Sequence, residues 1–202
     1  MRTDLHQYLE STEIVDWRKP AVLECASELA AGRTDTIEIA RACFHFVRDR
    51  VTHSGDAKAT VTTCSASEVL GHGTGWCFAK SHLLAALLRA NGIPAGFCYQ
   101  RLLLDDGSGF TLHGLNAVHL PTVGWYRIDP RGNKPGIEAQ FDPPEERLAW
   151  PIESPGEVDL PEIWPQPLPI VVRCLKKFHG WQQVVENLPD VAVLQGIPGS
   201  RT

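Results

Sequence analysis

The chain has 202 residues, of which 43% are hydrophobic and 21% charged, and its formal net charge at pH 7 is −5. This composition is typical of a single globular domain, and an acidic balance without a Lys/Arg cluster argues against a nucleic-acid partner. No apolar run approaches the ~18 residues that span a bilayer, and the first residues lack the apolar core of a signal peptide, so we expect a cytoplasmic protein without a membrane partner.

Two helices are expected near the start of the chain. The first begins at Pro20, a residue favoured at the first helical position, and ends near Gly32. The second follows a cap at Thr34 or Asp35 and carries an apolar stripe with helical spacing.

A third and a fourth helix flank a glycine-rich break, GHGTG. Ser65 with Glu68 forms a capping box that predicts a short helix start. The fourth helix is expected over residues 76–91, and its apolar residues leave little polar surface, so it should lie near the centre of the core. Asn91 and Gly92 end it, and Pro94 prevents it from restarting.

Strand patterns follow the helices. Residues 95–104, 110–120 and 124–130 are rich in β-forming residues, and the short segment before Gly124 reads as a hairpin connection. Helices first and strands afterwards predict an α+β fold in which a central helix packs on an antiparallel sheet.

The composition of the chain changes after residue 140, where prolines recur at short intervals and acidic residues outnumber basic ones. We expect residues 1–140 to form the core with its N-terminal helices, and residues 141–202 to form a proline-rich acidic arm and a C-terminal helix packed on that core. Trp150 and Trp164 are too apolar to lie free in solvent, which favours packing of the arm along the body. A frayed tail is expected over residues 196–202.

The cysteines occur without CxxC pairs, and in a reducing compartment most of them should be small buried residues. Cys77 differs, because it lies at the start of the fourth helix after glycines at 71, 73 and 75. Unpaired backbone N–H groups and the helix dipole favour a thiolate there. Cys77 is thus a candidate nucleophile, with a core residue, a disulfide half or a metal ligand as alternatives. The other cysteines are Cys25, Cys43, Cys64, Cys98 and Cys174.

A thiolate nucleophile needs a base, and the base needs a group that orients it. His113 and His119 lie on one predicted strand with Asp129 on its hairpin partner, so these two histidines have an orienting carboxylate nearby. The remaining histidines lie near the chain ends, inside helices, or in loops that could line a cleft: His6, His179, His45, His82, His53 and His72.

Strand parity favours His113 over His119. A connection of odd length between the two strands puts His113 and Asp129 diagonally on one face of the sheet. We therefore predict an odd loop, such as a three-residue loop with Gly124 in a left-handed conformation. His119 lies too near the turn to meet Asp129 easily.

Three blocks of the sequence resemble the transglutaminase-like superfamily of papain-like thiol enzymes. They are GTGWCFAKSHLLAALLRANGIPAGFCYQRL, LHGLNAVHL and GWYRIDPRGNK, which lie in the family's order within residues 65–136. The resemblance implies a papain-like fold, with Cys77 as nucleophile, His113 as base and Asp129 as the group that orients it.

The resemblance also implies a reaction. Members of this family transfer acyl groups from glutamine side chains, and bacterial members include peptidases and amidases. This chain departs from the family pattern H-A-W-x-E at residues 113–117, where it reads H-G-L-N-A. We expect a thiol enzyme that acts on a peptide or small amide through a thioester, with no metal and no cofactor.

Two further groups of residues are candidates for the site. The backbone N–H of Cys77 would bind the oxyanion, and Trp76 or Asn116 could supply a second donor, although either could equally be a packing residue. A cationic rim would suit a carboxylate on the substrate, unless its arginines pair with nearby carboxylates. The rim candidates are Tyr99, Arg101, Arg131, Asn133 and Lys134.

Three other interpretations compete with this one. The first is a catalytically inactive binding module of the same family. The second is acyl transfer from a thioester cofactor, as in the arylamine acetyltransferases, but no coenzyme A site is recognisable. The third is a metal site, whose spacing matches no common zinc pattern; its ligands would be Cys64, His72, Cys77 and His82.

Overall fold

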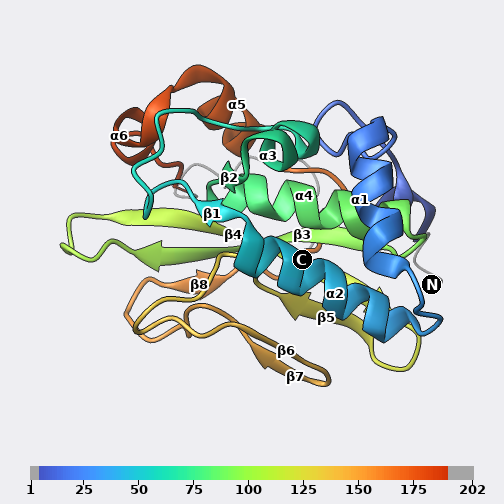
Figure 1. The fold of residues 1–202 in the computed structure, drawn as a ribbon. Helices are drawn as coiled ribbons and strands as arrows, with labels where there is room; N and C mark the ends of the chain where they lie inside the picture. The colour runs from blue at the N-terminus through green and yellow to red at the C-terminus, as the bar shows by residue number, and fades with distance from the viewer. Residues whose placement is uncertain (1–4, 191–202) are drawn as a thin grey trace.

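The computed structural model describes residues 5–190, in which four helices precede the main sheet (Figure 1). A short 3-10 helix, η1, opens the described chain. The elements of this first half are η1 (Leu5–Leu9), α1 (Pro20–Ala30), α2 (Thr36–Arg50), α3 (Ala66–His72) and α4 (Cys77–Ala90).

Local capping explains where these helices begin. Pro20 occupies the first turn of α1, and the side chain of Asp35 accepts a hydrogen bond from the Ile37 amide at the start of α2. Ser65 and Glu68 form the predicted capping box of α3. Each cap satisfies backbone N–H groups that the helix itself leaves unpaired.

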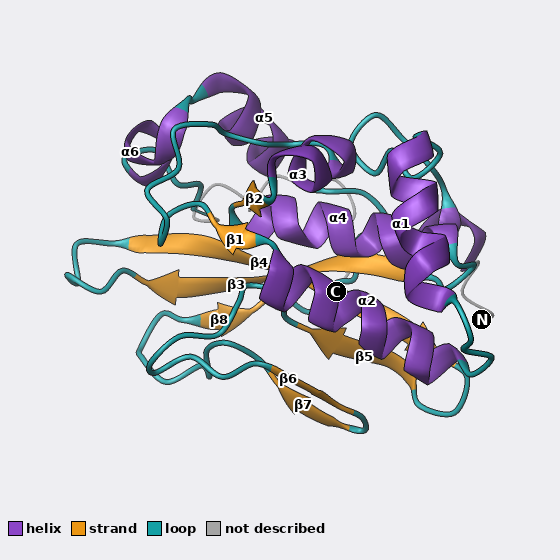
Figure 2. Ribbon diagram, viewed as in Figure 1, coloured by secondary structure: helices purple, strands orange, loops and turns teal. Residues whose placement is uncertain are grey.

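Helix α4 is the centre of the core. It packs against α1, α2 and α3 on one side and against β3 and β4 on the other, so that it lies between the other helices and the sheet (Figure 2). All of its residues from Cys77 to Arg89 are buried, as its nearly continuous apolar sequence predicts.

The main sheet is antiparallel and has the strand order β5-β4-β3-β8. Its first three strands coincide closely with the predicted segments, and the predicted α+β fold with a central helix on an antiparallel sheet is confirmed. The strands are β3 (Ala95–Leu103), β4 (Phe110–Leu120), β5 (Gly124–Ile128) and β8 (Val158–Asp159).

The connection between β4 and β5 has the predicted odd length. Leu120 pairs with Gly124, so three residues form the loop, and Gly124 has a φ of +79°. In this register Asn116 lies opposite Ile128, and residues of the same parity on the two strands share a face. His113 and Asp129 are both odd-numbered and are therefore brought to one face.

Besides β8, four short strands were not expected from the sequence. One pair joins the chain before α3 to the glycine-rich segment before α4, and the other forms a small hairpin at the far edge of the molecule (Figure 1). Segments of two or three residues carry too little periodicity to be recognised. They are β1 (Thr52–His53) with β2 (Thr74–Gly75), and β6 (Gln140–Asp142) with β7 (Glu145–Arg147).

The segment that follows β7 returns to the sheet. Its strand β8 pairs with β3, and Trp164 exchanges two backbone hydrogen bonds with Phe97 on β3. Two helices close the described chain, α5 (Pro169–Lys177) and α6 (Gly180–Val185). The predicted frayed tail, residues 196–202, lies outside the described residues. Within residues 5–190, no helix has the length and apolar character that crossing a bilayer requires.

Gly114 lies where α4 packs very closely on β4. A Cβ at this position would lie 2.6 Å from Cδ1 and 3.3 Å from Cα of Phe78. We expect Gly114→Ala to lower the free energy of unfolding by about 1–3 kcal/mol, the usual cost of overpacking a tight core. Denaturant unfolding measures this loss.

The matched control is Gly109→Ala, in the turn before β4. A Cβ there meets no atom within 4 Å, and the φ of Gly109 is not left-handed. Its effect should stay within about 0.5 kcal/mol, as for most surface substitutions. Equal losses in the two variants would contradict the close contact between α4 and β4.

Candidate active site

Cys77 is the first residue of α4, whose first turn packs on β4. The side chain of Ser81, one turn later, donates to the carbonyl of Cys77 at 2.9 Å and to that of Gly114 at 3.2 Å. This pair of hydrogen bonds ties the first turn of α4 to β4 beside His113. A Cβ on Gly75 would lie only 3.2 Å from Ala79 Cβ, so a side chain larger than hydrogen would crowd the approach to the helix.

His113 joins Cys77 to Asp129. Its Nε2 lies 2.7 Å from Asp129 Oδ2, and its side chain interacts electrostatically with Cys77, which raises the pKa of His113. The Asp129 carboxylate is fully buried and accepts two further hydrogen bonds, from the amides of Arg131 at 3.0 Å and Ala149 at 3.1 Å. The structure thus brings the three predicted residues together in the order thiol, imidazole, carboxylate.

Burial and neighbouring charges together determine the protonation of His113 and Asp129. Burial alone would lower the pKa of His113, but the charges on Asp129 and Cys77 raise it to about 10. Burial alone would raise the pKa of Asp129, but the charge of His113 and hydrogen bonds from His113, Ala149 and Arg131 lower it. At neutral pH the pair is therefore an imidazolium and a carboxylate.

Trp150 covers the imidazole. Its ring centroid lies 4.6 Å from that of His113, and the two rings are nearly perpendicular. The guanidinium of Arg131 lies over the Trp150 ring, 5.4 Å from its centroid. A ring over a buried hydrogen bond excludes water, which strengthens the electrostatic attraction between His113 and Asp129. Trp150 belongs to the proline-rich segment, and nothing local in the sequence indicated this contact.

A cleft of about 440 Å³ opens beside Cys77 and His113. Leucines from β3, β4 and the C-terminal segment line part of it, and three carboxylates lie along it. One of them, Glu157, already has protein partners, because it accepts hydrogen bonds from the amides of Leu103, Glu153 and Ser154. These bonds connect the proline-rich segment to β3. The lining includes Leu102, Leu112, Leu188, Asp105, Glu153 and Glu157.

The two candidates for a second oxyanion donor lie in different places. Trp76 lines the cleft, is only 6% exposed, and its Nε1 has no hydrogen-bond partner among the described residues. Asn116 is fully buried, and its Nδ2 donates to the carbonyls of Ser81 and Gly96. Asn116 thus links α4 to β3 and cannot reach a substrate, which corrects that candidate.

The expected cationic rim is also corrected. Arg131 lines the cleft but donates to both oxygens of Asp56, and Arg101 forms a two-bond pair with Asp190 outside the cleft. These pairings neutralise the two arginines. Three residues do not line the cleft and have structural contacts instead: Tyr99 with the Leu168 amide, Asn133 with Ala139, and Lys134 with Asp56.

The other cysteines are unsuited to nucleophilic chemistry. Burial raises the pKa of each of them above the ordinary value of 9.0, and a thiol that stays protonated is a poor nucleophile. The values are about 11 for Cys25 and Cys174 and about 12 for Cys43, Cys64 and Cys98.

The metal-site alternative finds no support in the described part of the chain. His82 is fully buried and its Nδ1 lies 2.7 Å from the carbonyl of Cys64, a contact with the backbone and not with the thiol. Within residues 5–190, no three His, Cys, Asp or Glu side chains are grouped so that they could hold a metal ion.

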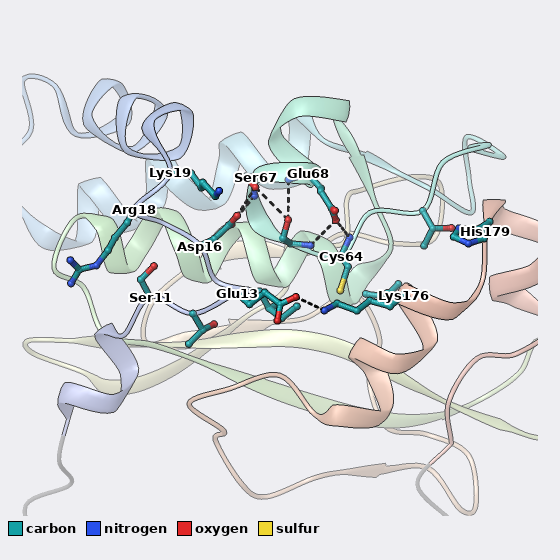
Figure 3. Close-up of a pocket in the computed structure, with 15 residues that line it drawn as sticks. Ser11, Glu13, Asp16, Arg18, Lys19, Cys64, Ser67, Glu68, Lys176 and His179 are labelled. Atoms are coloured by element: carbon teal, nitrogen blue, oxygen red, sulfur yellow. Dashed lines mark hydrogen bonds and ion pairs between the residues drawn. The ribbon is translucent and has the colours of Figure 1, made fainter.

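A larger cavity, of about 750 Å³, lies between the N-terminal segment, α3 and α5 (Figure 3). Its carboxylates already have protein partners: Asp16 accepts from Ser67, Glu68 caps Cys64 and Ser65, and Glu13 pairs with Lys176. Its one thiol is protonated, as described above. This cavity does not contain Cys77 or His113, which line the smaller cleft.

Comparison with known proteins agrees with this geometry. A family model for the transglutaminase-like superfamily matches residues 24–130, more than half of the chain. The chain belongs to the transglutaminase-like superfamily. Members of this superfamily are cysteine peptidases or transglutaminases, and the matched region contains Cys77, His113 and Asp129.

Several solved structures are similar to this chain at low sequence identity. A candidate cysteine protease from Cytophaga hutchinsonii is 17% identical with a TM-score of 0.54, over 65% of this chain and 43% of its own. The periplasmic domain of TgpA from Pseudomonas aeruginosa is 19% identical with a TM-score of 0.48, over 62% and 46%. Red sea bream transglutaminase is 13% identical with a TM-score of 0.47, over 57% and 27%.

The transglutaminase-like chain described here thus spans less than half the length of each of these relatives. No curated protein matches it.

Proposed function

We propose that this transglutaminase-like protein is a thiol enzyme that cleaves or exchanges an amide bond through a thioester on Cys77. The observation that supports the proposal is the arrangement of Cys77 and His113 in one cleft, with the His113 imidazole hydrogen-bonded to the buried Asp129 carboxylate and in electrostatic contact with Cys77. A buried carboxylate holds the imidazole in position and stabilises its charged form. A thiolate beside an imidazolium is a nucleophile at neutral pH.

The reaction proceeds in two stages. The Cys77 sulfur attacks the amide carbonyl carbon, and the C=O electron pair moves onto oxygen. When this intermediate collapses, the C–N bond breaks and His113 gives its proton to the departing amine, which leaves a thioester. Water or a second amine then attacks the thioester carbonyl carbon while His113 takes the proton of the incoming nucleophile, and the C–S bond breaks to return the Cys77 thiolate and release the acid or the new amide. Hydrolysis and transamidation therefore share the first stage.

Trapping the thioester tests this function. Protein incubated with a peptide mixture is quenched in acid, and mass spectrometry of the Cys77 peptide should show an acyl adduct that hydroxylamine removes as a hydroxamate. Adding a primary amine during turnover distinguishes the outcomes, because only a transamidase forms the substituted amide. A wild-type protein that forms no adduct with any substrate, while retaining its fold, would favour the alternative of an inactive binding module.

The cleft favours apolar or basic substrates over acidic ones. Its arginine is paired with Asp56, while exposed Asp105 and Glu153 carry negative charge along its rim. We expect peptides with a lysine near the scissile bond to show a kcat/KM about 2–5-fold higher than those with a glutamate, since exposed charges contribute only up to about 1 kcal/mol.

Glu153→Gln should reduce this preference, and added salt should reduce it in the wild type. Glu24→Gln makes the same charge change on an exposed position of α1 and serves as the control. A preference for glutamate-containing peptides would show that the rim charge does not select the substrate.

A further inference from the structure

His53 lies in the wall of the cleft because of the unexpected strand pair β1–β2. His53 is paired with Gly75, two residues before Cys77, and the Ser54 amide donates to the Gly75 carbonyl at 3.0 Å. The hydroxyls of Ser54 and Thr74 lie 3.1 Å apart and reinforce this pair. His53 is therefore held at a constant position relative to the start of α4.

The chain before His53 is also anchored. The buried ammonium of Lys80, one turn after Cys77 on α4, donates to the carbonyls of Arg48 and Val51 at the end of α2. These bonds satisfy carbonyls that the helix end leaves unpaired. Lys80 on α4 thus anchors the chain before His53, and strand β2, directly before α4, holds His53 itself.

The His53 ring packs against the cleft. Its centroid lies 5.3 Å from that of Trp76, with the rings nearly perpendicular, and its side chain is only 9% exposed. His53 lines the cleft together with Cys77 and His113. Its Nδ1 is buried without a hydrogen-bond partner among residues 5–190; the nearest carboxylate oxygen, on Asp56, is 3.7 Å away and Arg131 already occupies that group.

The protonation of His53 differs from that of His113. Burial and the positive charge of Arg131 lower the pKa of His53 to about 3, so its ring is neutral at working pH. A ring of such low basicity cannot serve as the general base, but a neutral imidazole is an effective donor to a developing oxyanion. Because Nδ1 makes no hydrogen bond to the described residues, the single ring proton is not tied to that nitrogen and can reside on Nε2.

We propose that His53 is a catalytic residue that donates a hydrogen bond from Nε2 to the substrate carbonyl oxygen as it becomes an oxyanion. The inference rests on the proposed thiol chemistry. The backbone N–H of Cys77 at the start of α4 supplies the other hydrogen bond, and no proton is transferred to or from His53. The residue takes the place for which sequence reasoning considered Trp76 and Asn116.

His53→Ala tests the proposal when two rates are measured on the same protein, the turnover of substrate and the alkylation of Cys77. Loss of one oxyanion donor should lower kcat about 10²–10³-fold, with little change in KM. Alkylation of Cys77 by iodoacetamide should keep its wild-type rate, because displacement of iodide forms no oxyanion. His53→Gln, which retains a side-chain N–H donor, should recover part of the lost kcat.

Each other outcome overturns the proposal. If alkylation slows as much as turnover in His53→Ala, the residue only positions Cys77 and its neighbours. If Trp76→Phe loses turnover while His53→Ala does not, the indole is the donor. If wild-type protein forms no acyl adduct at all, the proposed thiol function fails first; if it does and His53→Ala acylates at the same rate, only the assignment of His53 is wrong.

Discussion

Cys77→Ala is expected to reduce turnover of any amide substrate by at least about 10⁵-fold, because removing the nucleophile of a covalent mechanism leaves only the uncatalysed pathway and binding. The change removes a single sulfur from a side chain that is 7% exposed, so the fold should persist. Turnover and the mass of the intact protein after incubation with substrate measure the effect. The acyl adduct should disappear together with the activity.

Cys25→Ala is the matched control. Cys25 lies half-buried on α1, and burial keeps its thiol protonated by raising its pKa to about 11. This variant should retain full activity and the acyl adduct. A Cys77→Ala protein that still turns over substrate would exclude thiol catalysis and leave the cleft as a binding site.

Asp129→Ala is expected to lower kcat by about 10⁴-fold, the scale seen when the orienting carboxylate of a catalytic triad is altered. The carboxylate is fully buried and accepts hydrogen bonds from His113, Arg131 and Ala149. Removing it breaks this buried charge pair and leaves the Arg131 and Ala149 amides without their acceptor, which should also cost about 3–5 kcal/mol of unfolding free energy. Kinetics and denaturant unfolding measure the two effects.

Asp129→Asn separates geometry from charge. Both carboxylate oxygens accept N–H groups, so an asparagine that keeps its oxygen toward His113 must point its own NH₂ at the Arg131 amide. The loss of kcat should therefore also be on the order of 10⁴-fold. Burial alone lowers the pKa of His113, and the charge of Asp129 is the largest effect that raises it. Because Asp129→Asn removes this charge, the alkaline limb of the pH profile of kcat/KM should move from near pH 10 to lower pH.

The pKa shifts of His113 and Asp129 also determine how the stability of the folded protein depends on pH. Folding raises the pKa of His113, so its interaction with Asp129 stabilises the protein fully below about pH 6.5 and is lost as pH rises through about 10. Folding lowers the pKa of Asp129, so its contribution is present above about pH 3.8 and is lost as pH falls. An alkaline limb in Asp129→Asn that coincides with the wild type would contradict the assignment of Asp129.

Much of this site follows from local sequence. The capping residues Asp35 and Ser65 and the apolar run of α4 define helices from interactions within a few residues. The three-residue turn ending at Gly124 sets the register of β5 on β4. Strand parity then follows, which is why the proximity of His113 and Asp129 could be predicted.

The remainder of the cleft depends on contacts between distant segments. Trp150 reaches His113 from the proline-rich segment, and Arg131 is neutralised by Asp56, which precedes it by 75 residues. His53 enters through a two-residue strand too short to be recognised by periodicity. Each of these contacts was absent from the sequence-based description, and together they turned an expected cationic rim into one where exposed carboxylates dominate.

The sequence by itself determined the main helices and strands, the position of Cys77 at a helix start and the pairing of His113 with Asp129, because capping, periodicity and turn length act over a few residues. Only the tertiary structure decided which side chains line the cleft and which charges there are already paired. Those outcomes arise from packing between segments tens of residues apart, for which no local pattern in the chain provides a signal.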